Sequence, residues 1–206
     1  MNAMQRLSMG LEDMQLDVDD KMQAALLAYL ALLQKWNKAY NLTAIRDLDQ
    51  MVIRHLLDSL SLISFVEASP VLDVGTGAGL PGIPLAICLP HLSFVLLDSN
   101  SKKTRFLKQV KIELGLDNIE IVHARVEDYQ PAEPFQIITC RAFAALNTIL
   151  DRTQHLVTST TRLLAMKGKE DLDVLSAGFV KADEHILSVA FLDEDRHLVE
   201  IKPVPV

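Results

Sequence analysis

The sequence predicts an α/β protein, with a mostly parallel seven-stranded sheet, helices on both faces and an N-terminal helical extension. Three observations predict this fold class. Apolar residues in the first third of the chain recur at three- and four-residue steps, the period of an amphipathic helix. After residue 70, short apolar runs alternate with helical patterns, as in successive βαβ units. The last two apolar runs are close enough in sequence to form an antiparallel pair.

The first third of the chain is expected to be helical. In residues 19–38, Leu26, Leu30 and Leu33 follow the helical period, and Asp19 or Asp20 can cap the helix. Residues 47–65 repeat this pattern. A Pro at position 70 then marks a break in the character of the chain. We therefore expect two units, an N-terminal helical extension of residues 1–67 packed on the core and an α/β domain of residues 68–206.

The α/β domain is expected to alternate strands and helices. The expected strands are 71–74, 92–98, 119–123, 135–140, 161–166, 184–191 and 197–202. Helices are expected near 82–89, 101–115, 143–157 and 170–178. Right-handed crossovers through these helices produce parallel strands. Residues 193–196 form a link short enough for a hairpin, which would place an antiparallel edge on the sheet.

Composition narrows the class of protein. Half of the 206 residues are apolar and 23% are charged, the balance of a soluble globular domain. The apolar run at 24–33 is too short to span a bilayer, and residues 1–15 do not resemble a secretory signal, so we expect a cytoplasmic protein without a membrane segment. The two cysteines are far apart and the six histidines form no HExxH motif, so no metal site is expected.

The net charge of −7 disfavours nucleic-acid binding over the whole surface. Any contact with RNA must therefore use a local basic patch.

A glycine-rich segment, VLDVGTGAGLPGIP at 71–84, follows the first expected strand, where open α/β sheets bind ligands. Its letters GAGLPG match the dinucleotide motif GxGxxG, but they begin after the strand has ended and include Pro81. Counted from Asp73, the pattern acid-x-Gly-x-Gly-x-Gly instead resembles the loop of S-adenosylmethionine (SAM)-dependent methyltransferases. A turn without a ligand is the third alternative. The candidate residues are Asp73, Gly75, Gly77 and Gly79.

Two further acidic positions narrow the choice of cofactor. Asp98 ends the second expected strand, where both cofactor classes place a carboxylate that accepts the ribose hydroxyls. Asp98 alone therefore supports a ribose-bearing cofactor of either kind, although it can also cap the following helix. Val126 and Glu127 follow the third strand, where methyltransferases of this architecture bracket the adenine. The alternative for Glu127 is a solvated loop charge.

Seven blocks of sequence, taken together, resemble the RsmG (GidB) family, the bacterial small-subunit ribosomal RNA guanine-N7 methyltransferases. They are KWNKAYNLTAIRD (35–47), RHLLDSL (54–60), DVGTGAGLPGIPL (73–85), LDSNSKKTRFL (97–107), CRAFAAL (140–146), MKG (166–168) and RHLVEIK (196–202). The resemblance covers essentially the whole chain. It implies a Rossmann-like SAM-dependent methyltransferase fold, with SAM as cofactor and residues 68–206 as the methyltransferase domain.

The resemblance also implies roles for individual residues. It implies SAM contacts from Gly75, Gly77 and Leu80, a ribose contact from Asp98, and adenine contacts from Val126 and Glu127. Arg141 is implied at the cofactor, and its planar fork could orient either a base edge or the cofactor carboxylate. Its alternative role is a salt bridge to a loop acid. Ala78 and Cys140 stand where Pro and Ser are frequent, and we expect Cys140 to be a small buried residue rather than a nucleophile.

The implied reaction requires little from the protein. Guanine N7 has a free in-plane lone pair, so it can attack the sulfonium methyl group without a general base. The enzyme needs only in-line placement and tolerance of positive charge on the base.

The implied partner is small-subunit ribosomal RNA or the particle that contains it, bound by a monomer. The predicted RNA-binding residues are Arg54, Lys102, Lys103, Arg105 and Lys167, with Arg46, His55, Lys108, Lys111 and Lys169 as extensions of the patch. The alternative for the basic helix is a solvated face. We expect His55 and Asp58 to form a structural pair. Asn37 and Asn41 could either cap a helix or line the base pocket.

Two other functions remain open at this point. A small-molecule methyltransferase is favoured by the acidic net charge. A nicotinamide-binding oxidoreductase or nucleotide-binding regulator is allowed by the glycine pattern.

Overall fold

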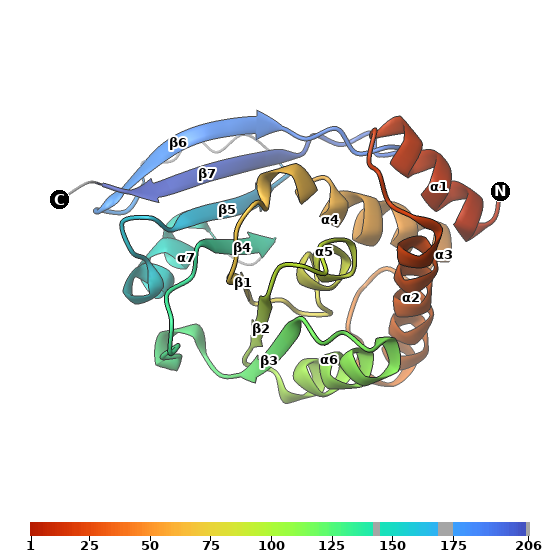
Figure 1. Cartoon of the computed structure of the whole chain (residues 1–206), viewed down its shortest axis with the longest axis horizontal. Helices are drawn as coiled ribbons and strands as arrows, with labels where there is room; N and C mark the ends of the chain where they lie inside the picture. The colour runs from red at the N-terminus through yellow and green to blue at the C-terminus, as the bar shows by residue number, and fades with distance from the viewer. Residues whose placement is uncertain (142–144, 169–174, 205–206) are drawn as a thin grey trace.

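The strands form one seven-stranded sheet in the order β3-β2-β1-β4-β5-β7-β6 (Figure 1). The computed structural model describes residues 1–141, 145–168 and 175–204. The strands are β1 Val71–Val74, β2 Phe94–Asp98, β3 Ile119–His123, β4 Ile137–Arg141, β5 Arg162–Lys167, β6 Phe179–Ile186 and β7 His197–Pro203. Strands β1 to β5 pair in parallel, whereas β7 runs antiparallel to both β5 and β6. The predicted sheet, including its antiparallel edge, is confirmed.

The strand order reverses between β1 and β4, which lie side by side in the middle of the sheet. Asp73 of β1 stands opposite Thr139 of β4 in the register. Crossovers leave this point in opposite directions, so a crevice opens beyond the carboxyl ends of the two strands. The glycine-rich segment and Arg141 both lie at that edge.

Helices cover both faces of the sheet (Figure 1). The helical segments are α1 Ala3–Asp13, α2 Asp20–Tyr40, α3 Leu48–Met51, η1 Val52–Leu57, α4 Asp58–Leu60, η2 Ile63–Phe65, α5 Gly82–Cys88, α6 Ser101–Leu114, η3 Val126–Asp128, α7 Leu146–Thr153 and η4 Gln154–Leu156. Alternate strand residues face opposite sides. Val71 and Leu96 pack against the cluster that includes α1, α2, α5 and α6, whereas Leu72 and Val95 pack against α7 and η3.

Polar residues cap both ends of helix α2, and the cap at Asp19 is the one that the sequence predicts. Asp19 accepts a hydrogen bond from the Met22 N–H at 2.7 Å, which satisfies one free donor of the first turn. Asn41 ends the helix in the left-handed conformation, with φ of 50°. The buried Asn37 amide bonds both the N–H and the C=O of Thr43 at 2.9 Å. The two asparagines therefore organise the end of α2, which favours the capping alternative.

The N-terminal segment differs from the prediction in two respects. Helix α1 has no counterpart among the predicted helices, because it buries only Leu7, Gly10 and Leu11 and so carries a weak apolar signal. Residues 47–65 do not form one helix, since η1 is a π-helical stretch between short α-helical turns. Gly10 lets α1 approach η1 closely, because a Cβ at this position would overlap the Leu57 side chain.

The C-terminal prediction was wrong in its boundaries. Residues 175–178 are not helical, and residues 169–174 lie outside the described ranges. Strand β6 occupies 179–186 rather than 184–191, so the connection to β7 runs from 187 to 196. The reason is burial. Edge strand β6 is mostly exposed and polar, whereas the apolar residues Leu187, Val189 and Ala190 belong to the connection and pack into the core.

Candidate functional site

The loop after β1 makes a tight turn that only glycine accommodates easily. Gly75, Gly77 and Gly79 have φ values of 65°, 63° and 96°, in the region that other L-residues rarely adopt. The Thr76 carbonyl accepts hydrogen bonds from the N–H groups of Gly79 and Leu80, both at 2.9 Å. The glycine spacing therefore follows from the backbone geometry of this turn.

Asp73 supports the loop from inside the sheet. Its carboxylate is fully buried, and Oδ2 accepts hydrogen bonds from Thr76 Oγ1 at 2.6 Å and from the Gly82 N–H at 2.9 Å. Burial raises the pKa of this carboxyl group to about 6. A Cβ at position 82 would come within 2.7 Å of Asp73 Oδ2, so Gly82 is required for this contact. The acid thus joins the two ends of the glycine-rich segment.

Asp98 lies at the end of β2 and faces the loop. Its Oδ2 accepts a hydrogen bond from the Gly77 N–H at 2.9 Å, and its Oδ1 accepts one from the Asn100 N–H at 2.8 Å. Lys103 Nζ lies 3.5 Å from the same Oδ2. Lys103, which the sequence assigned to RNA, is therefore beside the cofactor candidate Asp98.

A pocket opens between the loop and the ends of β2 and β3. Its lining residues are Val74, Gly75, Leu97, Asp98, Ser99, Ala124, Arg125, Val126, Glu127 and Arg152. Four of the predicted cofactor residues, Gly75, Asp98, Val126 and Glu127, are thus brought together. Gly77, Gly79 and Leu80 belong to the loop but not to this lining. We call this space the first pocket.

Glu127 closes one side of the first pocket through an ion pair that the sequence did not predict. Arg152 Nε, from α7, lies 3.2 Å from Glu127 Oε1. Both side chains are about 40% exposed, so the pair is accessible to water and can open at little cost. The alternative for Glu127, a solvated loop charge, is therefore incomplete, because the charge has a partner.

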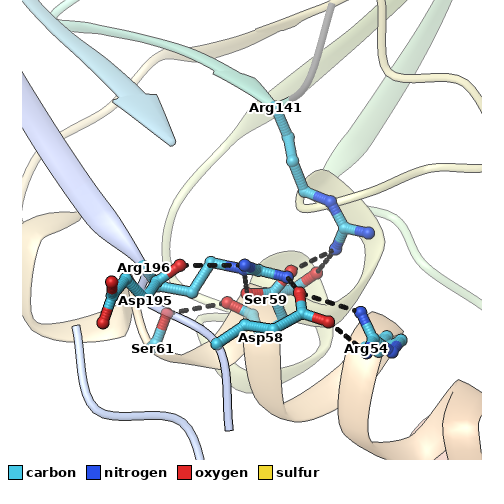
Figure 2. Close-up of polar contacts among 8 residues, drawn as sticks. Arg54, Asp58, Ser59, Ser61, Arg141, Asp195 and Arg196 are labelled. Atoms are coloured by element: carbon cyan, nitrogen blue, oxygen red, sulfur yellow. Dashed lines mark hydrogen bonds and ion pairs between the residues drawn. The ribbon is translucent and has the colours of Figure 1, made fainter. Parts of the chain in front are cut away.

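A second pocket lies at the carboxyl ends of β4 and β5, around Arg141. It is lined by Asp58, Arg141, Met166, Lys167, Gly168 and Arg196. Figure 2 shows Arg141 and Arg196 approaching Asp58 from two sides. Arg141 Nη1 lies 3.1 Å from Asp58 Oδ2, and Arg196 Nε donates to Oδ1 at 3.0 Å.

These contacts answer two of the sequence predictions. The partner of Arg141 is an acid, but it comes from the N-terminal helices rather than from a loop. The expected pair of His55 with Asp58 was wrong, because His55 Nε2 bonds Thr43 Oγ1 at 3.0 Å instead. Both oxygens of Asp58 are occupied by arginines, and its side chain is only 4% exposed.

A further ion pair borders the second pocket (Figure 2). Arg54 donates from both terminal nitrogens to Glu194, in the connection between β6 and β7. Arg196 Nη2 also donates to Glu194, at 3.2 Å. The hydrogen bond from Arg54 lowers the pKa of Glu194. Arg54, predicted to contact RNA, therefore has an acidic partner within the protein.

The other predicted RNA-binding residues fall into two groups. Lys102, Arg105 and Lys108 are exposed on α6, whereas Lys111 Nζ donates to the Ile119 carbonyl at 2.6 Å. Lys167 lines the second pocket. Lys169 lies outside the described residues. The structure therefore leaves an exposed basic face on α6 and a separate basic group around the second pocket.

Two residues with reactive side chains are buried and uncharged. Burial raises the pKa of Cys140 to about 12, which fits the predicted small buried residue rather than a nucleophile. Burial, with a smaller effect of Arg141, lowers the pKa of His55 to about 4, so its ring is neutral at pH 7.

Within the described ranges, no group of three or more His, Cys, Asp or Glu side chains could hold a metal ion. None of the helices in that part of the chain is long and apolar enough to cross a membrane.

Sequence reasoning missed Arg152 and Arg196, and it gave Asp58 the wrong partner. Asp58 and Arg196 are 138 positions apart, so no local spacing relates them. The only available signal was their presence in the RHLLDSL and RHLVEIK blocks, in which neither residue was connected with Arg141.

The strand order, the glycine loop after β1 and the carboxylate at the end of β2 are the features of a Rossmann-like SAM-dependent methyltransferase. Solved methyltransferases share this fold at low sequence identity. Magnesium protoporphyrin IX methyltransferase (ChlM) from Synechocystis PCC 6803 is 16% identical, with a TM-score of 0.58 over 91% of this chain and 99% of that chain. For mitomycin 7-O-methyltransferase MmcR the TM-score is 0.60 at 16% identity, over 87% and 67% of the two chains.

The chain belongs to the GidB family, rRNA small subunit methyltransferase G, whose sequence profile matches residues 22–199. The Ribosomal RNA small subunit methyltransferase G of Stutzerimonas stutzeri (strain A1501) is 57% identical over 173 residues, which cover 83% of this chain and 80% of the relative. The protein of the same name from Pseudomonas aeruginosa (strain LESB58) is 54% identical over 183 residues, which cover 87% of this chain and 86% of the relative. The predicted family and SAM chemistry are confirmed, and the nicotinamide alternative is set aside.

The first pocket has suitable groups for SAM. Asp98 is a carboxylate whose lone pairs can accept vicinal ribose hydroxyls, and the wall beside it is side-chain-free backbone at Gly75. Leu97, Ala124 and Val126 provide an apolar surface on which a flat purine ring can pack.

Proposed function

We propose that the protein transfers the methyl group of SAM to N7 of a guanine in small-subunit ribosomal RNA. One observation carries the proposal: two pockets of different chemistry open at the same edge of the sheet. The first contains Gly75 at the end of β1, and the second contains Arg141 at the end of β4. Strands β1 and β4 are direct neighbours, so a methyl donor in one pocket and an acceptor in the other would be adjacent.

We assign the cofactor to the first pocket. Gly75, Asp98, Val126 and Glu127 would hold it, and SAM supplies the methyl group when bound. The remaining candidate residues act on the shape of the loop. Gly77 ties the loop to Asp98, Gly79 provides the turn that leads to Leu80, and Asp73 holds both ends.

We assign the acceptor nucleotide to the second pocket, with Arg141 as its positioning group. Guanine N7 needs no proton removed, so the protein has only to hold the base in line with the methyl group. Methyl transfer leaves a positive charge on the base. The Asp58 carboxylate offsets the two guanidinium groups beside it, which reduces the repulsion that the charged product would meet.

We assign the RNA backbone to two basic surfaces. Lys102 and Arg105 are exposed on α6, while Arg54 and Lys167 lie around the second pocket. Lys103 is expected to act at the cofactor site as well, because it contacts Asp98. The proposed substrate is the ribosomal RNA or the particle that contains it. We expect the protein to act as a cytoplasmic monomer without a metal ion.

Transfer of label from radiolabelled SAM tests this function. Small-subunit particles, naked ribosomal RNA and a metabolite extract are offered separately, and labelled RNA is then cleaved at N7-methylguanine after borohydride reduction. We expect label in RNA and cleavage at a guanine. Label in the metabolite fraction alone would instead support a small-molecule methyltransferase, the function that the acidic net charge favours.

A further inference from the structure

Tyr29 lies beneath the glycine loop, although it comes from the N-terminal helix α2. Its side chain is fully buried, and its hydroxyl donates a hydrogen bond to the Ala78 carbonyl at 2.8 Å. Tyr29 and Ala78 are 49 positions apart in sequence. Burial raises the pKa of Tyr29, so the phenol keeps its proton and remains a donor.

The Tyr29 hydroxyl acts on a peptide group that is otherwise easy to reorient. The peptide group concerned joins Ala78 to Gly79, whose φ is 96°. Glycine moves between backbone regions at little steric cost, so this peptide can rotate at its Gly79 side. The same peptide is held at its other end, because the Gly79 N–H donates to the Thr76 carbonyl at 2.9 Å. Tyr29 and Thr76 therefore hold its carbonyl and its N–H, respectively.

The orientation of this peptide affects the rest of the loop. Gly77, the residue before Ala78, donates its N–H to Asp98, and Gly75 lines the first pocket. Ala78 is only 5% exposed, so water cannot easily replace the phenol as donor. Loss of the Tyr29 hydroxyl would leave a buried carbonyl without its partner, which favours rotation of the peptide.

We propose that Tyr29 is a positioning residue of the cofactor site, whose hydroxyl holds the glycine loop in the conformation that receives SAM. The inference rests on the proposed function, in which SAM occupies the first pocket. It gives the N-terminal extension an indirect part in cofactor binding, through the glycine loop. Tyr29 acts through the loop and is not expected to touch the cofactor.

The test measures the dissociation constant of S-adenosylhomocysteine by isothermal titration calorimetry. Tyr29→Phe removes the hydroxyl and retains the ring, which lies 6.3 Å from that of Phe106. We expect its dissociation constant to rise roughly 5- to 30-fold, the equivalent of a weakened or lost buried hydrogen bond. Amide hydrogen exchange at Gly79 should also accelerate relative to that in the wild-type protein.

Two matched variants separate positioning from general loss of stability. Tyr40→Phe makes the same change on the same helix, where the ring stacks on Trp36 at 5.2 Å and the hydroxyl makes no hydrogen bond to any described residue. Leu33→Ala removes buried apolar volume from α2 without removing a polar contact to the loop. We expect both variants to bind S-adenosylhomocysteine within about twofold of wild type.

Failure of the proposed function and failure of the positioning role of Tyr29 give different results. If the wild-type protein does not bind S-adenosylhomocysteine, the proposed function is wrong. If the wild-type protein binds it and Tyr29→Phe binds equally well, the positioning role is wrong. The role is also overturned if Leu33→Ala weakens binding as much as Tyr29→Phe does at an equal loss of melting temperature.

Discussion

Asp58 connects the N-terminal helices to the second pocket by forming ion pairs with two arginines. With its side chain 4% exposed, it is nearly removed from water, and each oxygen has a guanidinium partner. Removal of one partner from such a buried pair leaves the other charges uncompensated, which costs far more than the pair itself contributes. The geometry of Arg141 therefore depends on a residue that the sequence did not connect to it.

His55, close to this network, should make stability depend on pH. Burial lowers its pKa in the folded protein to about 4, whereas an unfolded histidine titrates near 6.5. Below pH 6.5 the unfolded state binds more protons, so stability is lost as pH falls from about 6.5 to 4. At pH 5 the loss is about 2 kcal/mol.

His55→Gln removes this titration. We expect the melting temperature of the variant, relative to wild type, to improve steadily as pH falls from 7 to 4.5. His91→Gln is the matched control, because His91 is exposed. Asp73 is present in every variant, so its own raised pKa cancels in the comparison. Parallel melting curves for His55→Gln and wild type across this range would contradict the assignment.

Helix α6 divides its basic side chains between two roles. It begins at Asn100, which accepts from the Lys102 N–H at 2.9 Å, and ends at Gly115 in the left-handed conformation. Phe106, Leu107 and Val110 of this helix face the core. The rotation of 100° per residue turns Lys103 toward Asp98, and it leaves Lys102 and Arg105 exposed.

This division predicts separable effects of mutation. The double variant Lys102→Glu/Arg105→Glu should weaken RNA binding and lower the slope of log affinity against log salt by about two, while binding of S-adenosylhomocysteine stays unchanged. Lys103→Met should mainly change cofactor affinity. Filter binding at several salt concentrations and calorimetry measure the two effects. An unchanged salt slope in the double variant would exclude α6 from the RNA interface.

The accuracy with which the sequence predicts a helix or strand depends on how strong its apolar pattern is. The boundaries of α2, α5, α6 and β3 were predicted to within two residues, because each has clear periodicity and recognisable caps or turns. Strand β6 and helix α1 were misjudged because their apolar signal is weak. An edge strand and a short surface helix bury few residues, and their formation depends on the elements beside them.

One of the two hydrophobic clusters in the described part of the chain extends across the boundary between residues 67 and 68. One cluster of buried residues includes Leu7, Leu30 and Leu60 from the extension together with Val71 and Leu96 from the sheet. Helix α1 and the carboxyl end of β7 lie at opposite sides of the molecule (Figure 1). We propose that the extension and the methyltransferase domain, although distinct in sequence character, fold as one cooperative unit.

Unfolding in urea tests whether the two segments unfold together. Trp36, the only tryptophan in the sequence, reports on the extension, while circular dichroism reports on all helices and strands. We expect the two transitions to coincide, as they do for a two-state domain, and residues 68–206 expressed alone to remain unfolded. Asp58→Ala should lower the free energy of unfolding by about 3–5 kcal/mol, because it leaves two guanidinium groups without their partner. Both transitions should therefore move to lower urea concentration together. An earlier transition at Trp36 would indicate two independent domains.

The fold class, the glycine loop, the carboxylate at Asp98 and the family could all be recognised from the amino-acid sequence. Each of these is carried by local spacing or by contiguous blocks of letters, so it can be identified without knowledge of packing. The contacts of Asp58 with Arg141 and Arg196, and of Tyr29 with Ala78, became visible only in the folded chain. These contacts join residues 49 to 138 positions apart, and they arise because the N-terminal helices pack across the edge of the sheet where β1 and β4 end.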